Sequence, residues 1–197
     1  MNALLHPQLA AIESLHTRHY IHRDIKPANF MILADSPSPV SFLIDFGLAQ
    51  RFRSPMTYIH TPYSPHGPVV GTLPFTSIVG QQGGTQSRRD DLESLAYTII
   101  FSARRELPWT GCRSSKTVLQ KKLGTPINVL CAGLPAPFCD FVTHVRSLEF
   151  DEMPDYQRLH SLLLLCSETG TNQCIEASPS VPIPVRAKRT PVVSDRV

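Results

Sequence analysis

Apolar residues recur at helical spacing along most of the chain, and this pattern predicts a mainly helical fold. Helices are expected over residues 8–17, 116–123, 127–131, 136–148 and 154–165. A further helix is expected to open at Ser87, a good N-cap residue, and to end at Leu107-Pro108-Trp109. The apolar residues within it, from Leu92 to Ile100, predict that this helix is buried.

Two short apolar runs, at residues 30–33 and 42–44, predict a pair of buried strands. The stretch 35–39 between them is rich in serine and proline and predicts the turn that joins them. Residues 48–70 contain four prolines and predict a long irregular segment, and the glycine-rich stretch 80–84 predicts a turn. The expected fold class is therefore mainly α (α+β), with one short β-hairpin.

The composition changes at Ser167, after which serine, threonine, proline and charged residues dominate. Such a segment cannot bury enough apolar surface to fold, so residues 167–197 are expected to form a disordered tail behind a folded domain of residues 1–166. The basic stretch 186–189 in the tail is interpreted as solvated, and a weak nuclear localisation signal is the alternative.

The composition of the chain favours an intracellular protein. Its 197 residues carry a net charge of +3 and give a sequence pI near 8.7, a mildly basic balance that does not call for nucleic acid. None of the five cysteines forms a C-x-x-C pair, which disfavours metal clusters and disulfide frameworks. The N-terminus does not read as a signal peptide, and no apolar run approaches the roughly 18 residues of a membrane span. We therefore expect a cytoplasmic or nuclear protein that binds neither nucleic acid nor membranes.

Two motifs carry the chemistry of the chain. Residues 22–29 read H-R-D-x-x-x-x-N, and Asp45-Phe46-Gly47 begins sixteen residues after Asn29. The pair matches the catalytic loop and the metal-binding motif of protein kinases. Either motif alone is common by chance. The two in this order, with apolar runs between them, favour a kinase-type catalytic loop.

The residue types in these motifs suit phosphoryl transfer, in which catalysis is mostly positioning and electrostatic stabilisation. Magnesium prefers oxygen ligands, which the Asp45 carboxylate and the Asn29 amide can supply. A separate carboxylate, Asp24, can orient the incoming hydroxyl and accept its proton. Lys26 lies two residues further on, so in an extended loop its ammonium returns to the side of Asp24 and can meet the transferred phosphate.

Further blocks of sequence add a family resemblance. The most specific is Q-S-R-R-D-D-L-E-S-L at 86–95, followed by L-P-W at 107–109. Others are T-P-I at 125–127, V-L-C at 129–131, R-S-L at 146–148 and P-D-Y at 154–156. With these blocks, residues 8–165 resemble the casein kinase I family of serine/threonine protein kinases. Other kinase families carry different residues at these places, so this resemblance is narrower than the two motifs alone allow.

The resemblance implies a protein-kinase-like C-terminal lobe that works with ATP and Mg. The reaction it implies is transfer of the ATP γ-phosphate to serine or threonine hydroxyls of a protein substrate. It implies that Asp24 is the catalytic aspartate and that Lys26 contacts the transferred phosphate, and so helps to bind the nucleotide. It also implies that Asn29 and Asp45 bind magnesium and the cofactor.

The same resemblance implies three supporting residues. Asp91 would accept backbone N–H bonds from the catalytic loop, although a plain helix-start carboxylate is the alternative for this residue. His22 and Phe46 would stack as part of an internal apolar spine.

The sequence departs from the family at positions that bear on activity. A kinase also has an N-terminal sheet lobe with a glycine-rich loop, a strand lysine and a helix glutamate, and these 197 residues contain no G-x-G-x-x-G. Pro74 stands where the family has an arginine that serves an anion site, which leaves the substrate preference open. Ala28, Thr85 and Ala96 are milder departures.

Two functions follow as alternatives. The first is a casein kinase I-type protein kinase represented by its C-terminal lobe, which is expected to be inactive or nearly so by itself. The second is a truncated or degenerate kinase lobe, a pseudokinase, that acts as a binding module. In either case a partner protein could occupy the face left open by the missing lobe. A small-molecule kinase is disfavoured by the block at 88–95.

Overall fold

The computed structural model describes residues 5–33 and 40–169, and this part of the chain is mainly helical, as the apolar spacing predicts. Its elements, in chain order, are α1 (Leu5–Thr17), β1 (Tyr20–Ile21), β2 (Phe30–Leu33), β3 (Val40–Leu43), β4 (Gln50–Arg51), α2 (Ile78–Gln81), α3 (Arg88–Arg104), α4 (Ser115–Gly124), α5 (Ile127–Leu130), α6 (Ala136–Ser147) and α7 (Tyr156–Thr169). None of the helices described is long and apolar enough to cross a bilayer.

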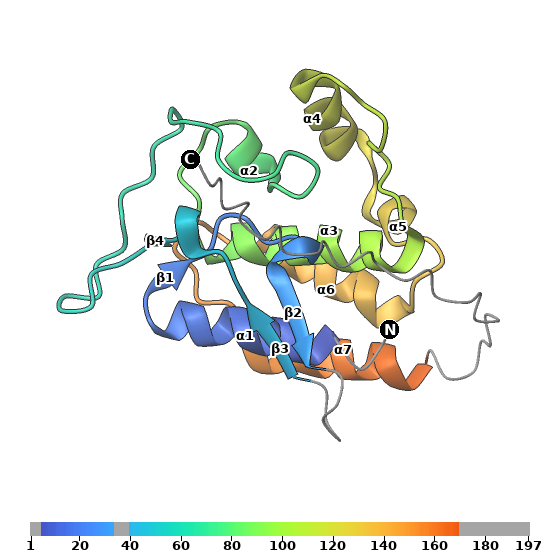
Figure 1. Ribbon diagram of the computed structural model, residues 1–197, viewed down its shortest axis with the longest axis horizontal. Helices are drawn as coiled ribbons and strands as arrows, with labels where there is room; N and C mark the ends of the chain where they lie inside the picture. Colours follow the sequence, from blue (N-terminus) through green and yellow to red (C-terminus); the bar gives the residue numbers. More distant parts are fainter. Residues whose placement is uncertain (1–4, 34–39, 170–197) are drawn as a thin grey trace, which may run out of the picture.

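Helix α3 is the centre of the fold. It lies between α1 and α7 on one side and α2 and α4 on the other (Figure 1). Ser87 is its N-cap, as predicted, and its apolar residues from Leu92 to Ile100 are buried. The helix ends at Arg104, three residues before the predicted stop, because Arg105 adopts a left-handed conformation (φ 62°) that turns the chain out of the helix.

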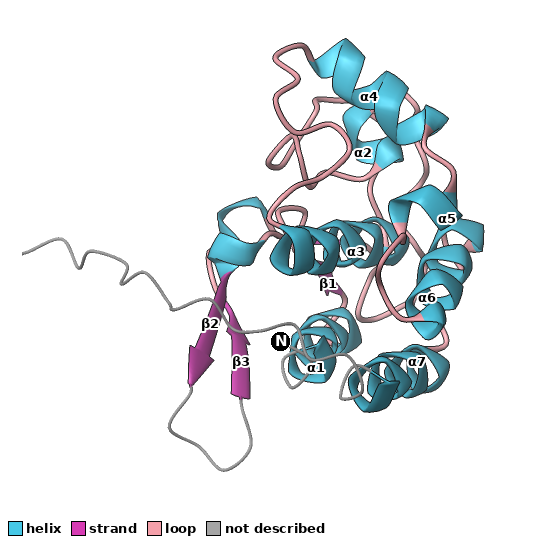
Figure 2. Ribbon diagram, turned by 90° about the vertical axis from the view of Figure 1, so that its right-hand side faces the viewer, coloured by secondary structure: helices cyan, strands magenta, loops and turns pink. Residues whose placement is uncertain are grey.

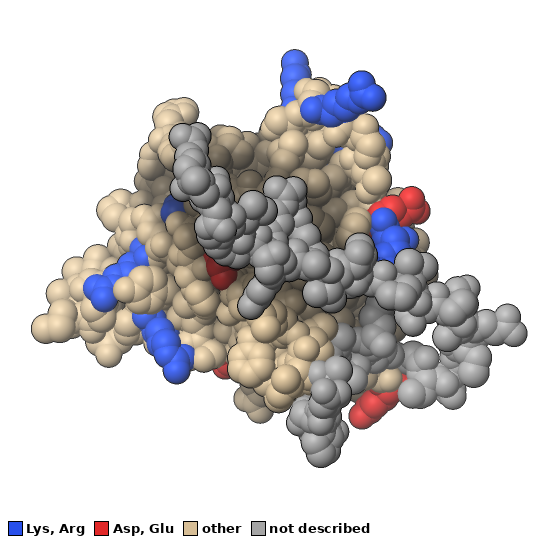
Figure 3. All heavy atoms as spheres, in the orientation of Figure 1, with Lys and Arg blue, Asp and Glu red and all other residues tan. Residues whose placement is uncertain are grey.

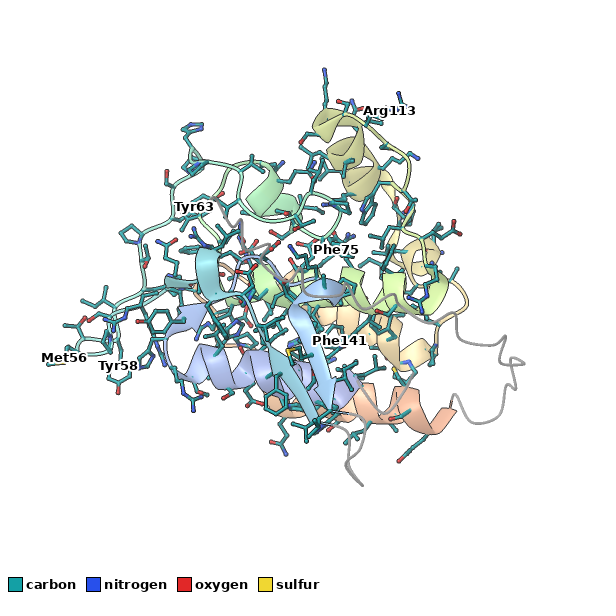
Figure 4. All side chains as sticks on the ribbon, viewed as in Figure 1. Met56, Tyr58, Tyr63, Phe75, Arg113 and Phe141 are labelled. Carbon is teal, nitrogen blue, oxygen red and sulfur yellow. The ribbon has the colours of Figure 1, made fainter. Side chains whose placement is uncertain are left out.

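The C-terminal helices complete the core from below and behind α3. Helix α6 packs against α3 and α7, and α1 packs against α7. The predicted apolar face of α6 is buried, and Phe141 on it points into the interior (Figure 4). The members of this face are Phe138, Phe141, Val142, Val145 and Leu148.

Strands β2 and β3 form the predicted antiparallel hairpin, with Phe30 opposite Leu43. The prediction that both strands are buried is wrong for most of their residues. Five apolar side chains of the hairpin are between 41% and 57% exposed: Met31, Ile32, Leu33, Val40 and Phe42. The reason is position, since the hairpin stands on the flank of the helices, with β3 against α1 (Figure 2). The predicted turn at 35–39 lies outside the described residues.

The long segment after the hairpin is irregular, as its prolines predict, but it contains one short pairing. Strand β4 pairs with β1, with Tyr20 opposite Arg51. Beyond it the chain makes a loop whose apolar residues Met56 and Tyr58 project far from the helices (Figure 4).

The glycine-rich stretch 80–84 is not simply a turn, because its first residues belong to the short helix α2. Ser77 caps this helix by accepting the Gly80 amide on its hydroxyl at 2.9 Å. A side chain at Gly80 would meet the Gln86 amide at 2.7 Å, so close packing explains this glycine. The left-handed Gly83 (φ 83°) then turns the chain toward α3.

The predicted start of the tail falls inside a helix. Helix α7 continues through Ser167 to Thr169. The Ser167 hydroxyl donates to the Leu164 carbonyl at 2.7 Å, so this residue is accommodated in the last turn despite its low helix propensity. The remainder of the predicted tail, 170–197, lies outside the described residues.

Asp90, in the first turn of α3, ties α2 to α3 and is almost fully buried, with 2% of its surface exposed. Its Oδ1 accepts the Ser77 hydroxyl at 2.5 Å, and its Oδ2 accepts the Ser87 amide at 2.7 Å. Burial raises the pKa of Asp90 to about 6, although both hydrogen bonds act in the opposite direction. The native protein therefore holds the Asp90 proton more tightly than the unfolded chain does.

We predict that this group makes the protein less stable as the pH rises from 3.8 to about 6. In that window the native state keeps a proton that the unfolded state has released, so rising pH favours unfolding. The loss is roughly 3 kcal/mol, since one pKa unit corresponds to about 1.4 kcal/mol. Urea titrations of the wild type and Asp90→Asn should therefore give free energies of unfolding whose difference changes across the window and is constant above it. A difference that does not depend on pH would contradict the prediction.

Candidate active site around Asp24

The predicted catalytic loop connects β1 to β2 and is anchored to the start of α3 by Asp91. The buried carboxylate of Asp91 accepts the His22 amide on Oδ2 at 2.7 Å and the Arg23 amide on Oδ1 at 2.9 Å. These are the backbone contacts that the resemblance implies for this residue. They fix the loop where Arg23 adopts the left-handed conformation (φ 66°). The positive end of the α3 dipole also favours a carboxylate in this first turn.

His16 extends this anchor to two further helices, and sequence reasoning missed it. Its Nε2 lies 2.9 Å from Asp91 Oδ2, and its Nδ1 lies 2.5 Å from the Tyr156 hydroxyl. Burial raises the pKa of Tyr156, so this hydroxyl keeps its proton and donates a hydrogen bond to His16 Nδ1. The other ring nitrogen, Nε2–H, is then the donor to Asp91. One hydrogen-bond chain thus joins α7, α1, α3 and the loop.

Asp24 is buried and accepts hydrogen bonds on both carboxylate oxygens. Its Oδ1 accepts the amide and the hydroxyl of Thr72, at 2.8 and 2.7 Å. Its Oδ2 accepts Lys26 Nζ at 2.6 Å and Asn29 Nδ2 at 3.2 Å. Burial acts to raise the pKa of Asp24, but the hydrogen bonds from Lys26 and Thr72 outweigh it and hold the pKa below its ordinary value. The carboxylate is therefore ionised at neutral pH.

Lys26 lies on the side of Asp24 that its spacing predicts. The backbone of Lys26 is extended, and its ammonium also donates to the Thr72 hydroxyl at 2.9 Å. Asn29 ends the short 3-10 turn that follows, and its Nδ2 donates to the Asp24 carbonyl at 2.9 Å. Three predicted site residues, Asp24, Lys26 and Asn29, are thus brought into direct contact.

Thr72 is a second site residue that sequence reasoning did not assign. It is separated from Asp24 by 48 positions yet supplies two of its hydrogen bonds. The signal in the sequence is the glycine before it. Gly71 has a φ of 101°, and a Cβ at this position would lie 2.5 Å from the Arg23 carbonyl oxygen. Only glycine lets the chain approach the loop this closely.

The second motif is joined to the catalytic loop through backbone groups. The Ile44 amide donates to the Asn29 carbonyl at 2.9 Å, and the Ile44 carbonyl lies 3.0 Å from His22 Nε2. The rings of His22 and Phe46 make the expected contact, edge to face, with centroids 5.3 Å apart. Asp45 follows Ile44 with its side chain exposed and a left-handed backbone (φ 63°).

The side chains of Asn29 and Asp45 suit a magnesium ion. Asn29 uses its Nδ2 within the loop, so its amide oxygen is left for a ligand. Asp45 is exposed and accepts a single weak bond, from the Gly47 amide at 3.3 Å. Among the described residues no three His, Cys, Asp or Glu side chains form a metal-binding group. The Asn29 amide oxygen and the exposed Asp45 carboxylate fit an ion that takes one or two protein oxygens and completes its shell with phosphates and water.

A family model described as fungal protein kinase matches residues 3–103, just over half of the chain. The chain belongs to this family. The match contains every site residue predicted from the sequence: His22, Asp24, Lys26, Asn29, Asp45, Phe46 and Asp91. A kinase-like fold is thereby shown for this protein.

The match to the fungal protein kinase family is coarser than the resemblance to casein kinase I. It includes the block at 86–95 but ends before L-P-W at 107–109 and the later blocks. Of these later blocks, L-P-W lies between α3 and α4, T-P-I and V-L-C lie at the two ends of α5, R-S-L lies at the end of α6, and P-D-Y lies at the start of α7.

We predict that Asp91→Ala loosens the catalytic loop without unfolding the protein. The variant leaves the His22 and Arg23 amides without their acceptor, which should cost about 1–3 kcal/mol. Amide hydrogen exchange at these two residues should become faster, while exchange in α6 and α7 should change little. Asp140→Ala, which removes an exposed carboxylate from α6, is the matched control. Unchanged exchange at His22 and Arg23 in Asp91→Ala would refute this anchoring.

Proposed function

We propose that this protein is a serine/threonine protein kinase of casein kinase I type, and that the described residues form its C-terminal lobe. The observation that supports this best is the setting of Asp24, which is an ionised, buried carboxylate held by Thr72, Lys26 and Asn29. The substrates would be ATP and serine or threonine hydroxyls of a protein.

In this proposal the catalytic loop orients the reacting hydroxyl. Asp24 would accept a hydrogen bond from the substrate hydroxyl and then its proton. The Lys26 ammonium, which pairs with the Asp24 carboxylate, would contact the phosphate that is transferred and stabilise its negative charge. Asn29 and Asp45 would hold magnesium, which when bound would neutralise negative charge on the phosphates.

The casein kinase I assignment is supported by contacts between the blocks that carry the resemblance. Arg89, in the block at 86–95, donates to the carbonyl of Leu148, in the block at 146–148, at 2.9 Å. Arg146 Nε lies 3.6 Å from Glu93 Oε1, and these two residues belong to the same two blocks. Blocks that are far apart in the sequence therefore contact each other in the fold, which gives a physical reason for them to occur together.

A second candidate function, a binding module, is favoured by one observation. The hairpin and the residues after it present an apolar surface, which we call the hairpin face and define as Met31, Leu33, Val40, Phe42 and Phe46. Beside it lies a cavity of about 400 Å³ lined by residues of α1 and β3. On the view that includes the hairpin, Lys and Arg side chains lie toward the margins, over α4 and near β1 and β4 (Figure 3). The occupant we propose is the sheet lobe of a protein kinase, because that lobe carries the glycine-rich loop and strand lysine.

We predict that the protein transfers phosphate from ATP to a protein substrate when a casein kinase I sheet lobe is supplied, fused ahead of Met1 or added in trans. Asp24→Asn should lower the rate by about a hundredfold or more, since it removes the proposed base. Asp140→Asn should leave the rate unchanged. The measurement is incorporation of labelled phosphate. An assembly that folds and binds ATP but stays inert would favour the binding module.

We predict that the chain by itself binds an apolar dye and self-associates through the hairpin face. An exposed patch of this kind is a binding surface or an aggregation liability. Phe42→Glu should reduce dye fluorescence and light scattering because it places a charge on a side chain that is 50% exposed at the centre of this face. Met56→Glu is the matched control, since Met56 is exposed in the distant loop. Equal effects of the two variants, or a dye-negative wild-type monomer, would be inconsistent with the prediction.

A further inference from the structure

Lys122, in α4, is a fully buried cation that makes no contact with the site residues described so far. Its ammonium donates to the Thr76 carbonyl at 2.6 Å and to the Leu73 carbonyl at 2.9 Å. It also lies 5.3 Å from the ring centroids of Tyr97 and of Trp109. No carboxylate in the described part of the chain lies within ion-pair distance of it.

The two carbonyls belong to a tight turn, which we call the Thr72–Thr76 turn. The amides of Phe75 and Thr76 both donate to the Thr72 carbonyl, at 2.9 and 3.0 Å, and close this turn. Trp109 Nε1 donates to the Pro74 carbonyl at 2.8 Å. The carbonyls of Leu73, Pro74 and Thr76 therefore all accept hydrogen bonds from Lys122 or Trp109. At its first residue the turn presents the Thr72 amide and hydroxyl to Asp24.

We propose that Lys122 is a positioning residue for Asp24: its buried ammonium holds the Thr72–Thr76 turn, and the turn holds the Asp24 carboxylate through Thr72. The inference deepens the proposed kinase function and rests on it for the role of Asp24. It identifies a residue outside both motifs, 98 positions after Asp24, that sets the geometry of the site.

The cost of burying this lysine supports a specific role for it. Burial lowers the pKa of Lys122 to about 8; Glu93 of α3 acts against this shift, and Arg146 of α6 adds to it. An apolar side chain of similar length, such as methionine, would fill the space between Tyr97 and Trp109 without that cost. What methionine cannot do is donate to the Leu73 and Thr76 carbonyls. The interaction unique to the lysine is therefore its hold on the turn.

The test compares Lys122→Met with Lys121→Met in the full chain. Lys121 is the preceding residue of α4, is exposed, and donates to the Pro108 carbonyl at 2.9 Å, so it controls for loss of a lysine from this helix. The first readout is the proton chemical shift of the Thr72 amide, which reports its hydrogen bond to Asp24 Oδ1. The second is amide hydrogen exchange at Thr72, Phe75 and Thr76.

For Lys122→Met we expect the Thr72 amide proton resonance to move upfield, because the turn no longer holds this amide against the Asp24 carboxylate at 2.8 Å. Amide exchange in the turn should become faster on the order of tenfold. Lys121→Met should change neither. A merely structural role would lower overall stability and leave the Thr72 amide shift, measured well below the unfolding temperature, where it is.

Lys122→Gln is the second variant, since it keeps two N–H donors in the buried site and covers the case in which Lys122→Met does not fold. Protection of the α3 and α6 amides verifies that each variant is folded. A folded Lys122 variant in which both the Thr72 amide shift and the exchange of the turn match the wild type would overturn the proposal. Neither readout uses nucleotide or substrate, so an inactive protein would contradict the proposed function without affecting this result.

Discussion

The candidate site depends first on one buried carboxylate at the start of a buried helix. Asp91 receives the amides of His22 and Arg23, so the catalytic loop takes its position from α3. The carboxylate can stay buried because every contact it makes is with a donor, and because the helix N-terminus favours its charge. The helix itself is fixed by the apolar core around it, from Leu92 to Ile100. Core packing and site geometry are thus connected through a single side chain.

Asp24 is held from two sides by segments that are far apart in the sequence. On one side, Asp91 binds the loop to α3 through the Arg23 amide. On the other side, Thr72 of the Thr72–Thr76 turn donates to the Asp24 carboxylate. The two supports use opposite charges, a buried carboxylate for backbone amides and a buried ammonium for backbone carbonyls. Each charge replaces its lost hydration with main-chain dipoles, which limits the cost of burial. Such contacts fix position more strictly than apolar packing does, because they depend on direction as well as distance.

The parts of this structure that could be predicted from the sequence are those encoded by short-range patterns. The faces of α3 and α6 follow from apolar spacing, and the contact between Lys26 and Asp24 follows from a spacing of two in an extended loop. Thr72 and Lys122 could not be found this way, because their partners are more than 45 positions away and neither belongs to a motif. An apolar run indicates a strand but not which layer covers it. The exposure of the hairpin follows instead from the resemblance, which implies that a kinase places this pair of strands under its sheet lobe.

The location of the hairpin face also bears on how the two candidate functions relate to each other. The supports of Asp24 come from α1, α3, α4 and α7, all on the helical side of the loop. The hairpin face borders a cavity that it shares with α1 and includes Phe46, directly after Asp45, and the groups that hold the Asp24 carboxylate belong to Thr72, Lys26 and Asn29 instead. A lobe that docks there would therefore meet the predicted magnesium ligand without displacing any group that holds Asp24. Because the exposed surface and the pre-formed geometry are separate, binding at the hairpin face can complete a site around Asp24 instead of competing with it.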